Sequence, residues 1–177
     1  MLTGMSLPSA VALVGTLTVI GLALISWWER RQERSLRAAA AEEGAKFEQR
    51  LRTPQFAALA AKLGHALPAS YEALHADHEL VRGSDWLIDV PNAMTGEDEC
   101  YVAWFEPADP EAVSFLPSVC EDLLPVADNG AGDRFLVDPR QSDPELFYFT
   151  HEDDALESTG VRLSEFLNAR RRPVPRE

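Results

Sequence analysis

The longest apolar run in the chain extends from Leu7 to Trp28 and contains no charged side chain. As a helix its 22 residues would be about 33 Å long, against a bilayer hydrocarbon core of about 30 Å. Trp27 and Trp28 end the run at the depth where an aromatic belt is expected, and Glu29-Arg30-Arg31 follows directly. The pattern predicts one transmembrane helix over residues 7–28, in contact with the lipid bilayer.

The flanks of this run favour an uncleaved anchor over a cleaved signal peptide. A signal peptide has a basic start, an apolar stretch of about 7–15 residues and a small-residue cleavage site directly after it. Here no basic residue precedes the run, and the alanines at 38–41 follow only after the tryptophans and several arginines. Basic flanks stay in the cytoplasm, and the basic flank here consists of Arg30, Arg31, Arg34 and Arg37. We therefore expect a single-pass membrane protein whose C-terminal part is cytoplasmic.

Residues 29–52 consist mostly of helix-forming residues and carry a net charge of +2. Acidic residues precede basic ones at the four-residue spacing that supports a solvated helix, in Glu33/Arg37, Glu42/Lys46 and Glu48/Arg52. Gly44 is expected to weaken or bend this helix. The pattern predicts a helical juxtamembrane stalk.

The remaining chain predicts an α+β domain over residues 53–169. One helix is expected over residues 53–63, and a second from Pro68 with Tyr71, Leu74 and His78 on one side. The pattern then changes to short β-branched or aromatic runs separated by turn residues, at 86–90, 100–105, 123–127, 134–137 and 146–150. A helix over 163–171 closes the domain. We expect a mainly antiparallel sheet with helices packed on one side. Residues 170–177, basic and proline-rich, are expected to form a disordered tail.

The charge of the chain is concentrated in this domain. The whole chain has 16 basic and 29 acidic residues, a net charge of −13. Residues 53–169 contain 23 acidic and five basic residues, a net charge of −18. Such a surface argues against nucleic-acid binding and suits a basic protein partner, although solubility alone also accounts for it. The candidate partner-binding surface comprises Glu97, Asp98, Glu99, Glu106, Asp109, Glu111, Asp153 and Asp154.

No pattern in the chain is typical of a catalytic centre. Cys100 and Cys120 have no zinc-type spacing and are expected to be buried free thiols. Residues 128–133 resemble the start of a calcium loop but lack its bidentate Glu, so a structural hairpin turn is favoured. His75 with His78, and His151 with Glu152, lack further ligands in the sequence. We expect no catalytic residue, no metal and no cofactor; a carboxylate-dependent metal hydrolase is the least favoured alternative.

Four segments carry a resemblance to a known family. They are a Leu-Pro-x-x-Tyr helix entry, a strand–glycine turn–strand segment with Gly-Asp, a strand ending in His-Glu, and a closing helix. The motif residues are Leu67, Pro68, Tyr71, Pro125, Gly130, Gly132, Asp133, Asp138, His151, Phe166 and Leu167. Together these segments resemble the SUKH superfamily of Smi/Knr-like domains over residues 47–168. One departure is the sequence at residues 77–80, where the family has Asn-Gly.

The resemblance implies a SUKH-like α+β fold and the function of a bacterial immunity protein. Such a protein binds a cognate toxin domain and neutralises it without chemistry of its own. A basic toxin domain would complement the acidic charge described above, and anchoring to the bacterial inner membrane would raise the local concentration where a toxin emerges. A membrane-attached scaffold or regulatory protein of the Smi/Knr type is the alternative.

Overall fold

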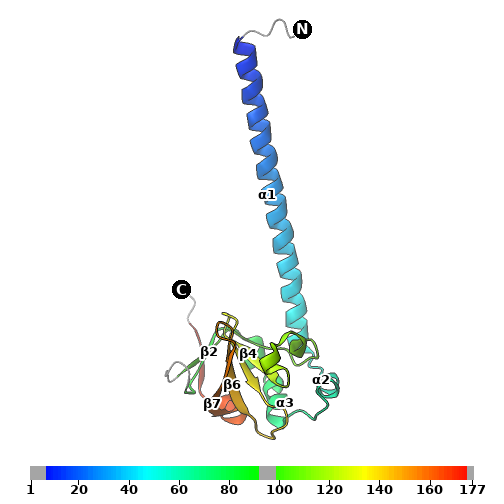
Figure 1. The fold of residues 1–177 in the computed structure, drawn as a ribbon, viewed down its shortest axis with the longest axis vertical. Helices are drawn as coiled ribbons and strands as arrows, with labels where there is room; N and C mark the ends of the chain where they lie inside the picture. Colours follow the sequence, from blue (N-terminus) through cyan, green and yellow to red (C-terminus); the bar gives the residue numbers. More distant parts are fainter. Residues whose placement is uncertain (1–6, 92–98, 175–177) are drawn as a thin grey trace. The chain divides into compact units, whose positions relative to one another are not determined.

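The computed structural model describes the backbone of residues 7–91 and 99–174 and, within these ranges, the side chains from residue 28 onward except that of residue 115. The chain divides into two compact units, Met1–Lys46 and Phe47–Glu177 (Figure 1). We call the second unit the C-terminal domain.

The first helix, α1 (Leu7–Arg52), continues through Gly44 without interruption. The three predicted ion pairs are present along its exposed side, with N–O distances of 2.5 Å in Glu33–Arg37, 3.0 Å in Glu42–Lys46 and 3.4 Å in Glu48–Arg52. The predicted helix over residues 29–52 is confirmed. Among the helices whose side chains are described, none is both long and apolar enough to cross a membrane. The predicted span, residues 7–28, lies outside those side chains except for the exposed Trp28.

The C-terminal domain begins inside α1, before the predicted boundary at residue 53. Phe47 packs against the hydrophobic core and Leu51 is part of it, so the last turns of α1 belong to the domain. Two helices follow, α2 (Phe56–Leu63) and α3 (Ala69–Ala76). Gly64, at φ 75°, ends α2 in the left-handed conformation that glycine adopts at low cost, and its N–H donates to the Ala60 carbonyl.

The helix predicted from Pro68 is two helices in the structure. Asp77 ends α3, and its carboxylate accepts the Leu80 N–H to begin α4 (His78–Arg82). Because of this break, His78 is exposed and does not share the buried side of Tyr71 and Leu74. His75 is buried in its place, with Tyr71 and Leu74.

All strand pairs of the domain are antiparallel, in two sheets. The smaller sheet has the order β2 (Cys100–Val102), β1 (Trp86–Ile88), β8 (Arg171–Pro173). The larger has the order β3 (Trp104–Phe105), β4 (Leu124–Asp128), β5 (Arg134–Val137), β6 (Glu145–Thr150), β7 (Ala155–Arg162). The predicted α+β class with antiparallel pairing is confirmed. The predicted strand over residues 100–105 serves both sheets, because it changes partner from β1 to β4 at Ala103.

The predicted disordered tail is wrong for residues 170–174. Residues 171–173 form β8, which pairs with β1 in the register Ile88↔Arg171. Arg171 also pairs with Asp77 at 2.6 Å, and Arg172 donates two hydrogen bonds to Glu99. These ion pairs and the backbone hydrogen bonds to β1 hold residues 171–173 on the domain, although the segment is too polar to be held by apolar packing. Residues 175–177 lie outside the described part.

Both faces of the larger sheet are covered. Strand alternation turns Phe135 and Tyr148 toward the helices, where Phe166 of α5 (Leu163–Asn168) packs on Phe135 at a ring distance of 6.0 Å. Leu136 and Phe149 face the other way and pack with the buried Cys120 and Leu123. The cover on this second face comes from Leu116 and from the 3-10 helix η2 (Ser118–Cys120), which follow the 3-10 helix η1 (Ala112–Phe115). Cys100 and Cys120 are buried and not joined in a disulfide, as predicted.

Candidate functional site

The predicted acidic surface lies only partly within the residues that the structure describes. Glu97 and Asp98 lie outside them. Glu99 lies beside β2 and accepts two hydrogen bonds from Arg172, at 2.8 and 3.0 Å. Asp153 and Asp154 are exposed in the turn between β6 and β7. Burial raises the pKa of the Cys120 thiol, and the negative charge of Asp154 raises it further. The turn between β6 and β7 therefore lies close to the segment that covers the second face of the larger sheet.

Asp109 is not a surface residue, and its prediction as a partner contact is wrong. It is 2% exposed, and Arg50 of α1 donates two hydrogen bonds to it, from Nε at 2.5 Å and from an Nη at 2.9 Å. One carboxylate oxygen also accepts the N–H groups of Glu111 and Ala112. Burial by itself would raise the pKa of Asp109, but these donors outweigh it and hold the pKa below its ordinary value. Glu111 is exposed, 3.4 Å from Arg50.

Glu106 is partly buried at the end of β3. Its carboxylate accepts a hydrogen bond from the Trp104 side chain, and the Arg134 guanidinium lies close enough to favour its ionised form. Burial still dominates and raises the pKa of Glu106. Arg134 also pairs with the buried Asp128 at 3.4 Å. Glu106 therefore belongs to a small charged group and is not a freely solvated contact.

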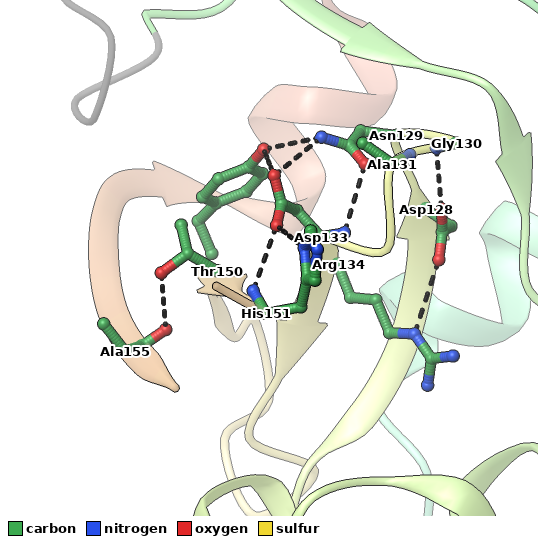
Figure 2. A network of polar contacts seen from close by, with 10 residues as sticks. Asp128, Asn129, Gly130, Ala131, Asp133, Arg134, Thr150, His151 and Ala155 are labelled. Carbon is green, nitrogen blue, oxygen red and sulfur yellow. Dashed lines mark hydrogen bonds and ion pairs between the residues drawn. The ribbon is translucent and has the colours of Figure 1, made fainter. Parts of the chain in front are cut away.

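The turn between β4 and β5 contains the densest polar network of the domain that the structure describes (Figure 2). Gly130 and Gly132 have φ of 82° and 102°, which glycine adopts without steric cost. Asp128 accepts the Gly130 N–H, while Asn129 accepts the N–H groups of Ala131 and Asp133. The favoured prediction, a structural hairpin turn, is confirmed. Within the described residues no group of three or more His, Cys, Asp or Glu is placed to hold a metal.

Asp133 is the centre of this network. One of its carboxylate oxygens accepts from the Tyr148 hydroxyl and the Asn129 amide, at 3.1 and 2.9 Å, and the other accepts the His151 N–H at 3.0 Å and lies 2.8 Å from His151 Nδ1. The hydrogen bond to Asp133 raises the pKa of His151. Burial and the Asp133 charge raise the pKa of Tyr148 to about 12. This arrangement orients the imidazole and ties β6 to the hairpin.

The Asp133–His151 pair gives a measurable prediction. An NMR titration of the full-length protein is expected to place the pKa of His151 above 6.5, because Asp133 stabilises the imidazolium. Asp133→Asn should bring the pKa of His151 back toward 6.5, since the amide carries no charge. Asp138→Asn is the matched control, because Asp138 pairs with Arg140 and not with His151. A His151 pKa that is the same in all three proteins would contradict the assignment.

The motif residues behind the resemblance have structural positions. Tyr71 is fully buried and its hydroxyl donates to the Pro125 carbonyl at 3.3 Å, which links α3 to β4. Pro68 precedes the first residue of α3, Asp138 pairs with Arg140 after β5, and Phe166 is in the core. Leu67 and Leu167 pack against the core from its edge. These positions account for packing and for the turn between β4 and β5.

The fold and its polar groups define an α+β protein with antiparallel sheets, a glycine hairpin and an acidic surface. Comparisons with protein-family models, with curated proteins and with solved structures each give no match.

Proposed function

We propose that the protein is a membrane-tethered immunity protein of SUKH type, which neutralises a basic toxin domain by binding it and without chemistry of its own. The observation that carries the proposal is the charge of the domain, −18 over residues 53–169. Many of these carboxylates are exposed, among them Glu72, Glu79, Asp89, Glu121, Asp122, Glu152, Asp153, Asp154 and Glu157. A surface of this sign attracts a basic partner and accelerates its encounter.

The proposed location is the cytoplasmic side of the bacterial inner membrane. The charge-free run at residues 7–28 and the four arginines that follow it within ten residues support this orientation. Two buried cysteines that form no disulfide agree with a reducing compartment. Fusions after Glu177 test the orientation: a fluorescent protein should be bright and alkaline phosphatase inactive, and the opposite pair of results would reverse the topology.

Co-expression with a toxin domain encoded beside this gene tests the function. We expect the full-length protein to protect the cell and to be recovered in a complex with the toxin domain. The association rate should fall as salt rises, because screening weakens long-range attraction. A salt-independent rate would exclude electrostatic steering, and neither protection nor complex formation would exclude the immunity function. Binding without protection would favour the scaffold alternative.

A further inference from the structure

We propose that the exposed face formed by Leu87, Tyr101 and Trp104 binds an arginine-rich segment of a protein partner. We call this surface the aromatic face. The inference rests on the proposed function and specifies the part of the acidic domain that meets the partner. Among the described residues of the C-terminal domain, the exposed large hydrophobic side chains are Tyr101, Trp104 and Val119, so two of the three belong to this face.

The two aromatic side chains point outward because strand alternation breaks between them. Val102 and Ala103 are both buried, at the position where the chain leaves β1 and joins β4. Tyr101 and Trp104 flank this buried pair and are 39% and 37% exposed. Leu87 lies directly opposite Tyr101 in the ladder, on the same side of the sheet. The change of partner strand thus places the three side chains on one outer surface.

Neighbouring polar groups hold the aromatic side chains in place. The Tyr101 hydroxyl donates to Asp85 at 2.6 Å, and the Trp104 side chain donates to Glu106. The β4–β5 turn approaches Trp104 so closely that a Cβ on Gly130 would lie 3.7 Å from the indole Cζ3. Side chains that are already ordered lose little entropy when a partner binds, which is characteristic of aromatic hot spots.

The charges around the aromatic face select a cationic partner. Three carboxylates border it, from Asp85, Glu99 and Glu106, while the guanidinium groups of Arg172 and Arg134 are paired with Glu99 and with the buried Asp128. An arginine of a partner can stack its planar guanidinium on an indole or phenol ring and donate to a carboxylate at the ring edge. Lysine carries the same charge but stacks less well. The chemistry of the face therefore fits arginine better than lysine.

The test measures binding of synthetic peptides to the full-length protein in detergent micelles. Three peptides of equal length alternate glycine with arginine, lysine or glutamate. We expect the arginine peptide to bind most tightly, the lysine peptide more weakly and the glutamate peptide not at all. Hydrogen exchange should show protection at residues 85–88 and 99–106. Protection confined to the β6–β7 turn would overturn the proposal.

Variants separate this face from the acidic surface in general. Trp104→Leu and Tyr101→Leu keep apolar bulk but remove the ring. Each should lower the affinity for the arginine peptide at least about fivefold. Asp153→Asn with Asp154→Asn removes two charges elsewhere and should change affinity less than about twofold. Thermal unfolding identifies any variant that fails to fold, and Tyr101→Phe, which keeps the ring but loses the hydrogen bond to Asp85, should bind the arginine peptide more tightly than Tyr101→Leu. Unchanged affinity in both leucine variants would overturn the proposal.

The outcome for the toxin complex is independent of these results. If the full-length protein forms the complex while the leucine variants form it equally well, the aromatic face is excluded and the proposed function stands. If the wild type binds the arginine peptide on this face but forms no complex with the toxin domain, the immunity function fails and the binding face stands.

Discussion

Replacing Arg50 by methionine is expected to lower the free energy of unfolding of the C-terminal domain by about 3 kcal/mol. Arg50 donates two hydrogen bonds to the buried Asp109 carboxylate, at 2.5 and 2.9 Å. Methionine keeps much of the apolar stem, so the loss comes from a buried charge deprived of its cation. Urea denaturation of the full-length protein in micelles, followed by near-UV circular dichroism, measures the change.

Arg52→Met is the matched control, two residues further along the same helix. Arg52 pairs with Glu48 at 3.4 Å, and both side chains are about half exposed. This exposed pair should contribute less than about 0.5 kcal/mol to the free energy of unfolding. Arg50→Met combined with Asp109→Asn should recover about 1 kcal/mol or more, because no charge is then left buried. If both substitutions lowered the free energy of unfolding by the same small amount, the Arg50–Asp109 pair would not be important for stability.

The difference in stability between the Arg50 variant and the wild type should depend on pH. In the wild type the pKa of Asp109 lies below its ordinary value of 3.8, so its stabilising contribution is present above pH 3.8 and is lost as pH falls through the lower folded pKa. Without Arg50, the pKa of Asp109 should lie above its wild-type value, because the hydrogen bond and the charge of Arg50 that lower it are lost while burial remains. Protonation would then relieve the buried charge, and the stability deficit of the variant should shrink on acidification.

His75 is expected to cost the domain about 3 kcal/mol of stability as pH falls from 7 to 4. The side chain is 1% exposed and packs edge-on against Tyr71 and Phe56, at ring distances of 4.8 and 6.0 Å. Neither ring nitrogen has a hydrogen-bond partner among the described residues. Burial therefore lowers the pKa of His75 from 6.5 to about 4. The unfolded chain takes up the proton below pH 6.5 and the folded chain does not, so stability is full above 6.5 and decreases toward pH 4.

His75→Leu isolates this effect. Leucine has a similar volume and no polar atoms, so the variant should be about 1–2 kcal/mol more stable than the wild type at pH 7.5. The difference between variant and wild type should then widen by about 2 kcal/mol at pH 5. His151 works in the opposite direction in this range, because its raised pKa gives a contribution present below pH 6.5 and lost above the folded pKa. Because His151 is present in both proteins, comparing the variant with the wild type at the same pH cancels its contribution. A constant difference across the range would exclude His75 as the titrating group.

Local patterns predicted much of the fold. The run at residues 134–137 coincides with β5, since a short continuous apolar run between turn sequences indicates a buried strand. The glycine turn before β5 was also predictable, because its residues are adjacent in the sequence. Two strands, β7 and β8, were not predicted. β7 has a bulge opposite β6 and a glycine at φ 73°, and half of it is exposed. β8 is basic and ends in proline, and its partner β1 lies more than 80 residues earlier in the chain.

The sites were less predictable than the fold because they depend on distant contacts. Asp109 looked like one acidic residue among many, although Asp-Pro-Glu is a turn sequence and indicated a carboxylate that accepts backbone N–H groups. Its partner Arg50 is 59 residues away. The outward direction of Tyr101 and Trp104 depends on the change of partner strand at Ala103, which a local alternation pattern does not contain.

The position of β8 has a consequence for synthesis of the protein. β1 leaves the ribosome before its neighbour β8, because more than 80 residues separate the two strands. A nascent chain emerges and folds from its N-terminal side. The smaller sheet is therefore completed only when residues 171–173 have emerged, and until then β1 presents an open edge to other nascent chains. Closure of this edge should be the last step in maturation of the domain.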